Sequence, residues 1–464
     1  MIVVQNRFFP IRSFVIFLVE GGIIFLSVMA SFSVLRQFGE SGGISVQDAL
    51  IRGLVVAIFC QVCLYMLDLY DLKVSYTVGE LFFSLLFAVG FVCIGIGLLS
   101  YVLPDFGIEG KMYYLTILFI TVLLLVWRIA FDIYLKKMAP RENIAIMGTN
   151  QTADLVSKEV RKREKFGFRF VGFFDSAKRN DSKKPENGEI LGSYREMQEI
   201  VRKRKIDKVV VALEERRGEY PVSALLALRV SGSKIVEWPE FFEKLSGRIP
   251  IENLAPSYII FNDGFRKSSI VLTIRRVIST MVAAMACIVL MPVILVVALL
   301  IKLESPGPVF YTQKRVGQNG RAFRICKFRS MRDDSEVEGK PQWATLDDPR
   351  ITRIGRFIRP TRIDELPQVI NVLRGDLDIV GPRPERPEFV SELEHIIPYY
   401  SLRHTVKPGV TGWAQVMFPY CGTIEESKEK LQYDLYYIKN MSIKLDLLIL
   451  FRTLKIVILG RGAR

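Results

Sequence analysis

The chain has 464 residues, half of them apolar, with a mean hydropathy of +0.26 and a formal net charge of +15. This length and composition fit either two or three domains or a membrane protein, and the placement of the apolar residues decides between them. Four of the six cysteines lie in apolar segments, and the set implies no disulfide framework or zinc site, which excludes a disulfide-stapled fold.

Four early apolar segments have lengths close to the ~20 residues that a helix needs to cross a bilayer. The first segment is too long for a cleaved signal peptide, and no small-residue cleavage site follows it. We therefore interpret residues 1–140 as four transmembrane helices. They cover residues 13–35, 50–67, 81–103 and 113–134.

Basic residues around these segments give their orientation. The loops at residues 37–49 and 104–111 are poor in Lys and Arg, whereas the other flanks are basic. By the positive-inside rule, the N-terminus and everything after residue 140 are cytoplasmic. The flanking basic residues are Arg7, Arg12, Lys73, Arg128, Lys136, Lys137 and Arg141.

We interpret residues 142–250 as a Rossmann-like cytoplasmic α/β domain, because β-rich runs alternate with polar helical stretches. The first run ends in a turn at Gly148 that resembles a dinucleotide-binding turn, but Asn150 and Ala153 replace the second and third glycines. Because the missing middle glycine blocks close approach of a pyrophosphate, we favour a structural or regulatory domain. The β-rich runs are NIAIMGT, FRFVGFFD, KVVVAL and SKIVEWP.

After a linker at residues 251–269, a fifth apolar stretch covers residues 270–303 with Pro292 near its middle. A straight helix of this length would be ~50 Å long, more than the ~30 Å apolar core. Proline in a helix predicts a sharp bend. A helix that enters, bends and returns would explain the basic residues at both ends; the alternative is a fifth spanning helix.

Basic residues gather in the remaining chain. In the segment RAFRICKFRSMR, alternation puts Lys327 and Arg329 on one face of an extended strand. Further on, Arg353, Arg356 and Arg359 recur at every third residue, which is the spacing of a helical face. The guanidinium group suits the oxygens of a diphosphate, so this pattern favours an anionic substrate over an ordinary solvated surface.

The adjacent acids Asp364 and Glu365 follow these cations. Helical neighbours point about 100° apart, so the two carboxylates have different roles. Pro367 places the pair at the start of a helix, where Thr361 and the acids could form a loose capping box. Catalysis is the other interpretation: one carboxylate as nucleophile and the other as ligand of Mg²⁺. Spacing alone leaves both open.

Four motifs together resemble the catalytic domain of bacterial polyprenyl-phosphate hexose-1-phosphate transferases. The similarity extends from about Arg275 to the C-terminus. The membrane helices and the Rossmann-like domain in front resemble the large members, the undecaprenyl-phosphate sugar phosphotransferases that start exopolysaccharide or O-antigen synthesis. The motifs are RVGQNGRAFRICKFRSM, ITRIGRFIRPTRIDELPQVINVLRGDLDIVGPRP, LRHTVKPGVTGWAQV and YDLYYIKN.

The resemblance implies a monotopic phosphoglycosyl transferase in the bacterial inner (cytoplasmic) membrane. The fold class would be an α+β membrane protein: a four-helix transmembrane bundle, the Rossmann-like domain, a re-entrant helix at residues 270–303, and a small α/β catalytic domain, residues 304–464, at the cytoplasmic membrane interface. In a ping-pong reaction, Asp364 would take the sugar phosphate from a UDP-sugar, release UMP and pass it to undecaprenyl phosphate. Glu365 would bind the cofactor Mg²⁺. The resemblance assigns Lys327, Arg329, Arg359 and Arg383 to the substrate diphosphate.

Two positions depart from the family pattern: Met291 stands where many members have Ser before the kink proline, and Arg362-Ile363 stands where many have Ser-Leu. Neither removes a proposed catalytic group, but Arg362 leaves open how the substrate pocket is shaped. We also expect a homodimer formed through residues 142–250 and the membrane helices, and no nucleic-acid partner.

Three alternative functions explain the sequence less well. A membrane-bound sugar-nucleotide epimerase or dehydratase needs an intact glycine-rich turn and usually a Tyr-x-x-x-Lys motif, and the chain has neither. A non-enzymatic membrane scaffold leaves the acid pair and the arginines unexplained. A retaining glycosyltransferase would rest on Asp376-x-Asp378 alone, a motif that is common by chance.

Overall fold

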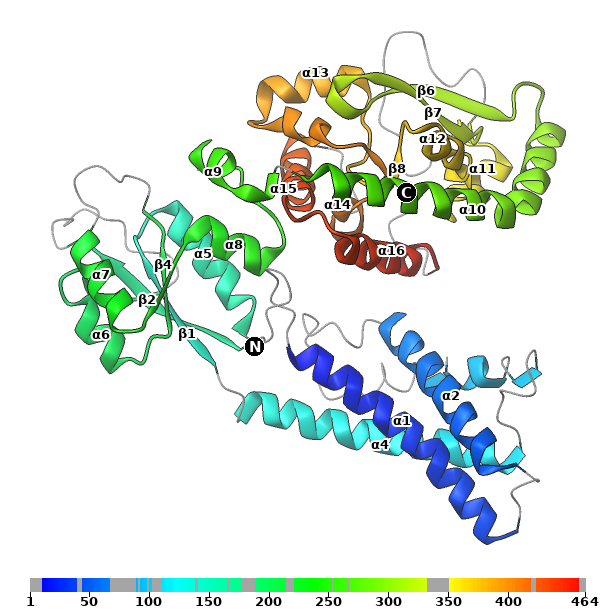
Figure 1. The fold of residues 1–464 in the computed structure, drawn as a ribbon, viewed down its shortest axis with the longest axis horizontal. Helices are drawn as coiled ribbons and strands as arrows, with labels where there is room; N and C mark the ends of the chain where they lie inside the picture. The colour runs from blue at the N-terminus through cyan, green and yellow to red at the C-terminus, as the bar shows by residue number, and fades with distance from the viewer. Residues whose placement is uncertain are drawn as a thin grey trace. The chain divides into compact units, whose positions relative to one another are not determined.

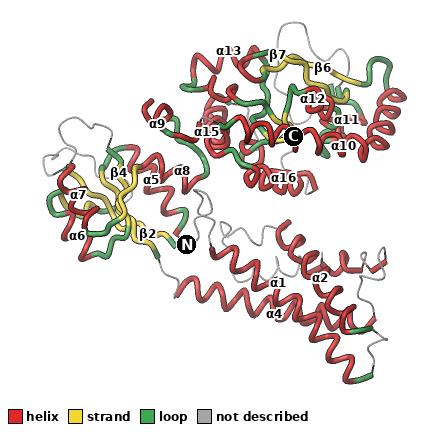
Figure 2. Tube along the Cα trace, viewed as in Figure 1, coloured by secondary structure: helices red, strands yellow, loops and turns green. Residues whose placement is uncertain are grey.

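The computed structural model describes residues 11–39, 44–66, 89–90, 92–97, 100–101, 110–137, 141–164, 167–176, 188–213, 221–252, 254, 256–265, 267–331, 350–418 and 423–458. The chain forms two compact units, Met1–Leu245 and Ser246–Arg464. Figure 1 labels their elements, and Figure 2 colours the same trace by secondary structure. Four helices in the described ranges are long and apolar enough to cross a membrane: Val15–Gln37, Val46–Tyr65, Gly110–Phe131 and Ser269–Glu304.

Three of the predicted transmembrane segments are helices: α1 (Ile11–Gln37), α2 (Val46–Met66) and α4 (Gly110–Lys137). They pack through a common apolar core that includes Ile24 and Ile120. The predicted segment at residues 81–103 lies largely outside the described residues.

The core of these helices also contains an ion pair. Arg128 of α4 donates from Nη2 to Glu20 Oε2 of α1 at 2.9 Å, and Glu20 is fully buried. Arg128 lies inside the candidate span Gly110–Phe131, so it is a paired residue of the helix core rather than a flanking charge. The predicted orientation therefore rests on the remaining basic residues.

Residues 142–237 contain a five-stranded parallel sheet with the order β3-β2-β1-β4-β5. Apolar residues on alternate positions of β1 face opposite sides, so Ile144 and Ile146 pack with α5 and α8, and Ala145 and Met147 pack with α6 and α7. The elements are β1 (Glu142–Met147), α5 (Gln151–Arg161), β2 (Phe168–Asp175), β3 (Ile190–Ser193), α6 (Met197–Lys203), β4 (Lys208–Val211), α7 (Val222–Val230), β5 (Lys234–Glu237) and α8 (Trp238–Ser246).

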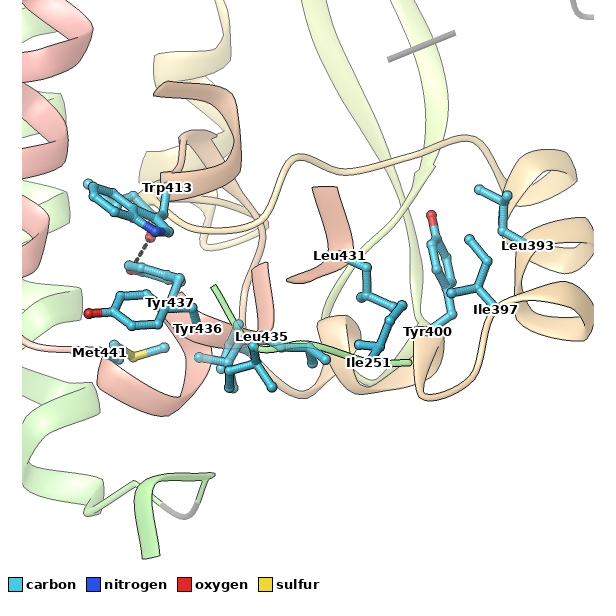
Figure 3. Packing of buried hydrophobic residues seen from close by; sticks show 14 of the residues in the cluster. Ile251, Leu393, Ile397, Tyr400, Trp413, Leu431, Leu435, Tyr436, Tyr437 and Met441 are labelled. Atoms are coloured by element: carbon cyan, nitrogen blue, oxygen red, sulfur yellow. Dashed lines mark hydrogen bonds between the residues drawn. The ribbon is translucent and has the colours of Figure 1, made fainter. Parts of the chain in front are cut away.

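The C-terminal unit has a large core of aromatic and aliphatic side chains, which Figure 3 shows. Ile249, Ile251 and Leu254 are buried in it, so the segment interpreted as a linker is packed against the unit that follows it. The core elements are α9 (Pro256–Phe261), α13 (Pro387–Ile396), α14 (Trp413–Met417), α15 (Ile424–Asn440) and α16 (Ile443–Ile458).

The candidate catalytic residues lie on elements that surround one long helix, α10. The hairpin β6–β7 is antiparallel, and two short strands, β8 and β9, pair in parallel. These elements are α10 (Ser269–Glu304), β6 (Phe310–Val316), β7 (Ala322–Phe328), α11 (Arg353–Ile358), α12 (Gln368–Arg374), β8 (Asp378–Val380) and β9 (Gly409–Thr411).

Helix α10 contains Pro292, and its ribbon changes direction before the chain reaches β6 (Figure 1). Proline cannot donate the helical hydrogen bond and its ring clashes with the preceding turn, which gives the bend a local cause. The apolar side chains around the proline are largely exposed, as a membrane-embedded helix requires: Met281, Met285, Ile288, Val289, Leu295 and Leu299.

Pro292 divides α10 into a first arm and a second arm, and both arms contact the rest of the C-terminal unit. In the first arm, Ala283 packs in a cluster with Val372 of α12; in the second arm, Ile301 packs with Phe328 of β7. Because the same unit contacts the helix before and after Pro292, both arms belong to the body that holds the candidate site.

The two ends of α10 are also attached to this unit by charged groups. Near the first end, Arg275 Nε donates to Asp446 Oδ2 of α16 at 2.7 Å. At the other end, Glu304 Oε1 accepts from the backbone N–H of Arg353 at 2.7 Å. The start and the end of the apolar helix are therefore fixed to one compact body.

Candidate active site

The two adjacent acids lie on a 3-10 turn, η5 (Ile363–Glu365), between α11 and α12. The backbone N–H of Glu365 donates to the carbonyl of Arg362 at 3.1 Å, which closes the turn. The side chain of Glu365 is only 9% exposed, whereas Asp364 is half-buried. Adjacent acids thus lie in different surroundings, as their angular separation predicts.

Glu365 is surrounded by cations. Its Oε1 accepts from Lys327 Nζ at 2.8 Å and from Arg383 Nη2 at 3.0 Å, and Arg362 Nη1 lies 3.7 Å away. Burial alone would raise the pKa of Glu365, but these cations, Arg383 foremost, hold it well below its usual range. Glu365 is therefore an ionised carboxylate that organises the surrounding positive charges.

Asp364 has a different environment. Within the described part of the chain, its buried Oδ1 accepts no hydrogen bond. Burial raises the pKa of Asp364 to about 6, although the charge of Lys327 lowers it. A more basic carboxylate is a better nucleophile than one neutralised by cations, so this asymmetry is compatible with the predicted role of Asp364, which stays a prediction.

Helix capping does not explain the pair. Thr361 Oγ1 donates to the carbonyls of Phe357 at 2.9 Å and Ile358 at 3.2 Å, so it bonds backward to α11. The residues that precede η5 and α12, Arg362 and Pro367, make no side-chain cap bond. The interpretation of Thr361 as part of a capping box is therefore wrong, because its hydroxyl is used at the end of the preceding helix.

A buried amide fixes the position of Lys327. Asn371 of α12 is fully buried; its Oδ1 accepts from the N–H of Cys326 at 2.9 Å and its Nδ2 donates to the carbonyl of Arg324 at 2.7 Å. These bonds join α12 to β7 beside Lys327. Phe328 is buried on the other side of the strand, as alternation predicts.

A buried ion pair supports Arg383. Arg403 Nη2 donates both to the carbonyl of Arg383 and to Asp434 Oδ2, each at 2.9 Å. The two charged side chains are 3% and 2% exposed, so the pair is almost fully desolvated. Sequence reasoning did not single out Arg403 or Asp434, although both lie in motifs that carried the family resemblance.

The remaining predicted cations occupy different places. Arg359, half-buried after α11, acts on Asp364 through its charge. Arg329 instead donates to the carbonyls of Ser305 and Pro306, each at 2.9 Å. It is 5% exposed and holds the end of α10, and its contact with a substrate stays a prediction.

Residues 270–460 match the family described as bacterial sugar transferase, and residues 65–236 match the family described as CoA-binding domain. The undecaprenyl-phosphate glucose phosphotransferase of Komagataeibacter xylinus is 31% identical over 409 residues, which cover 86% of this chain and 75% of that protein. The chain belongs to the bacterial sugar transferase family. It is thus a member of a family of transferases.

Other relatives of this sugar transferase match shorter segments. The UDP-N-acetylgalactosamine-undecaprenyl-phosphate N-acetylgalactosaminephosphotransferase of Aeromonas hydrophila is 46% identical over 222 residues, covering 48% of this chain and 52% of that protein. The UDP-glucose:undecaprenyl-phosphate glucose-1-phosphate transferase of Escherichia coli K12 is 31% identical over 314 residues, covering 67% of this chain and 66% of that protein. The chain thus spans about half the length of the first relative and two thirds of the second.

The match to a CoA-binding domain raises the question of whether the turn after β1 fits a pyrophosphate. Asn150 Oδ1 accepts from the N–H of Ala153 at 2.8 Å, and its Nδ2 donates to the carbonyl of Ala212 at 2.8 Å. The start of α5 is thus capped by its own chain, and Asn150 bridges β1 to β4 at the point where a doubly wound sheet receives its ligand. Asn150 thus occupies the position that the dinucleotide-binding pattern gives to its second glycine.

The acid pair was also predicted to hold Mg²⁺. In the described ranges, no three His, Cys, Asp or Glu residues gather in a way that could hold a metal ion. In phosphoryl-transfer sites, however, Mg²⁺ uses one or two carboxylates together with substrate phosphates. Glu365 Oε1 is engaged by Lys327 and Arg383, and the unpartnered acid oxygen is Oδ1 of Asp364, so binding of Mg²⁺ at Glu365 stays a prediction.

Proposed function

We propose that this sugar transferase moves a sugar 1-phosphate from a UDP-sugar to undecaprenyl phosphate and releases UMP, as a membrane step of exopolysaccharide or O-antigen synthesis. The names of the relatives from Komagataeibacter, Aeromonas and Escherichia support this reaction class. The observation that carries the mechanism is the asymmetry of the acid pair: Asp364 Oδ1 lacks a hydrogen bond within the described ranges, whereas cations neutralise Glu365.

In the first half-reaction, an oxygen of Asp364 attacks the phosphorus that carries the sugar. The bond from that phosphorus to the bridging oxygen breaks, its electron pair stays on the departing UMP, and an acyl phosphate remains on the enzyme. In the second half-reaction, an oxygen of undecaprenyl phosphate attacks the same phosphorus and restores the carboxylate of Asp364. No proton has to move in either step.

The cations around the pair stabilise the phosphate oxygens while charge shifts toward the departing group. Lys327 and Arg383 are fixed beside Glu365 by their ion pairs, so they face the substrate without further ordering. Glu365 would hold Mg²⁺, which, when bound, screens phosphate charge.

The proposal places the reaction at the cytoplasmic face of the bacterial inner membrane, with α10 as a re-entrant helix. A helix of 36 residues would be ~54 Å long if straight, more than the ~30 Å apolar core. Attachment of both its ends to one compact unit supports entry and exit on the same face. The exposed Leu447, Phe451 and Leu454 of α16 supply further apolar surface on that unit.

The strand order of residues 142–237 matches the first five positions of the doubly wound order 3-2-1-4-5-6, which supports a Rossmann-like domain. Because the turn after β1 is capped by Asn150, we assign this domain to contact or regulation rather than to redox chemistry. The same feature argues against an epimerase or dehydratase. The homodimer remains our proposal, and a dimeric mass in nanodiscs at micromolar protein would support it.

The test uses the full chain in nanodiscs with radiolabelled UMP, UDP-sugars and no lipid acceptor. We expect labelled UMP to exchange into the matching UDP-sugar, and Asp364→Asn to abolish the exchange while the fold survives. Adding undecaprenyl phosphate should then move the sugar phosphate into an organic-soluble product. Exchange that persists in Asp364→Asn would rule out the nucleophile assignment.

A further inference from the structure

Arg362, immediately before η5, has a left-handed backbone with φ 57° and ψ 16°. This conformation costs a residue other than glycine roughly 1–2 kcal/mol. The two backbone hydrogen bonds of Arg362, to the carbonyl of Arg359 and from the N–H of Glu365, are each 3.1 Å long and are available to any residue. The backbone does not require arginine here, so an arginine in this strained position points to a role for its side chain.

The Arg362 guanidinium is the outermost of three cations on one carboxylate oxygen. Its Nη1 lies 3.7 Å from Glu365 Oε1, whereas Lys327 and Arg383 are within hydrogen-bond distance of the same atom. Exposure follows the same order: the side chain of Arg362 is 37% exposed, that of Arg383 29% and that of Lys327 19%. Arg362 thus lies at the solvent-facing edge of the cluster.

The positive charge around the acid pair exceeds the negative charge of its two carboxylates. With Asp364 and Glu365 ionised and without Mg²⁺, four cations leave an excess of two positive charges, which balances the two negative charges of a nucleotide-sugar diphosphate. The four cations are Lys327, Arg359, Arg362 and Arg383.

We propose that Arg362 binds the phosphate that is not transferred: the phosphate of departing UMP in the first half-reaction and the phosphate of undecaprenyl phosphate in the second. This inference rests on the proposed function. Arg362 is the most exposed of the three cations around Glu365, so it is the one placed to meet the second phosphate.

The stereochemistry of displacement makes one position serve both substrates. Asp364 and the group it displaces lie on opposite sides of the phosphorus, because attacking and leaving oxygens are roughly in line. In the second half-reaction Asp364 becomes the leaving group, so the lipid phosphate must attack from the side that UMP has left. UMP and undecaprenyl phosphate therefore use one phosphate subsite in turn, and its cation affects both.

The experiment compares Arg362→Gln and Arg362→Gly with Arg374→Gln, which removes an exposed arginine from the end of α12. Calorimetry on the full chain in nanodiscs measures the Kd for UMP, and turnover measures the KM for undecaprenyl phosphate. A charge-assisted hydrogen bond to phosphate corresponds to about tenfold in affinity. We expect about tenfold weaker UMP binding and a similar rise in KM in both Arg362 variants, and less than a twofold change in Arg374→Gln.

The glycine variant separates the side chain from the backbone, because glycine adopts the left-handed conformation without cost. Tight UMP binding in Arg362→Gly would overturn the assignment of the guanidinium. Weaker UMP binding with an unchanged KM for the lipid would overturn the shared subsite. If the wild type exchanges UMP into UDP-sugar but neither Arg362 variant differs from it, only this inference fails. A wild type without exchange would refute the proposed function itself.

Discussion

The two acids of the site should have opposite effects on stability when each is replaced by its amide. Asp364→Asn removes a half-buried charge whose buried Oδ1 has no hydrogen bond within the described ranges, so we expect a more stable protein. Glu365→Gln removes the carboxylate that neutralises Lys327 and Arg383, so we expect a less stable one. A residue kept for its chemistry at a cost in stability is typical of active sites.

The magnitudes follow from the surroundings of each acid. Burial raises the pKa of Asp364 from 3.8 to about 6. The folded state then binds more protons between these pH values, so the stability falls as the pH rises through this window, and the full cost is present above pH 6. At 1.36 kcal/mol per unit the cost is about 3 kcal/mol, which solvent screening of a half-buried group reduces to about 1–2 kcal/mol. Glu365→Gln removes one partner of a buried ion pair and leaves the other charge unpaired, which costs about 3–5 kcal/mol.

The assay is the melting temperature of the full chain in nanodiscs at pH 7.5 without Mg²⁺. About 2–4 °C per kcal/mol is expected for a unit of this size. Asp364→Asn should therefore melt a few degrees higher than the wild type and Glu365→Gln several degrees lower. Glu392→Gln, which changes an exposed acid on α13, should stay near the wild type. A loss of about 1 kcal/mol in both variants is what helix capping predicts, and that result would refute the assigned roles.

Three further outcomes are expected. Burial lowers the pKa of His404 to about 4, so the stability that neutral His404 contributes is complete above pH 6.5 and is lost as the pH falls toward 4. Thermal denaturation across this window should show a loss of up to about 3 kcal/mol. The variant His404→Gln should show a flatter dependence of stability on pH. Glu20→Gln deprives Arg128 of its buried carboxylate and should lower the melting temperature, whereas replacing both with apolar residues should restore it. In a chain without its native cysteines, Ser257→Cys and Lys314→Cys, on either side of α10, should both react from the cytoplasmic side; labelling from opposite sides would refute the re-entrant helix.

The elements that the sequence predicted are those with a strong local pattern. The apolar runs of α1, α2, α4 and α10 are long enough to indicate helices by composition. The runs FRFVGFFD and KVVVAL correspond to β2 and β4. The four-residue strand β3 (Ile190–Ser193) was missed, because a short segment that contains a glycine has too little alternation to indicate a strand.

The candidate linker was misleading for a different reason. Its proline and polar residues indicate a loop, but Ile251 and Leu254 are buried in a cluster that also contains residues of α13, α14, α15 and α16. Long-range packing of this kind leaves no signal in the local sequence. The same applies to Arg403 and Asp434, which are 31 positions apart and meet through tertiary structure.

Within the site, alternation was reliable only where the strand continues. Lys327 and Phe328 lie on opposite faces of β7, as period-two spacing predicts. Strand β7 ends at Phe328, and the expectation that Arg329 shares the face of Lys327 stays a prediction. Arg329 donates to Ser305, a partner that no sequence pattern links to it.

The hydrogen bonds of Arg329 connect the end of the apolar helix α10 to the part of the chain that contains the acid pair. The end of α10 is held by Arg329 on the carbonyls of Ser305 and Pro306, and Glu304 accepts from the first backbone N–H groups of α11. Helix α11 leads directly into the cations and the acid pair. In the proposed arrangement, the depth of α10 in the bilayer would set the height of the acid pair above the lipid surface, because a few short hydrogen bonds join the end of α10 to α11. The proposed reaction would need this fixed height, because a water-soluble nucleotide sugar and a membrane-bound phosphate would both have to reach Asp364.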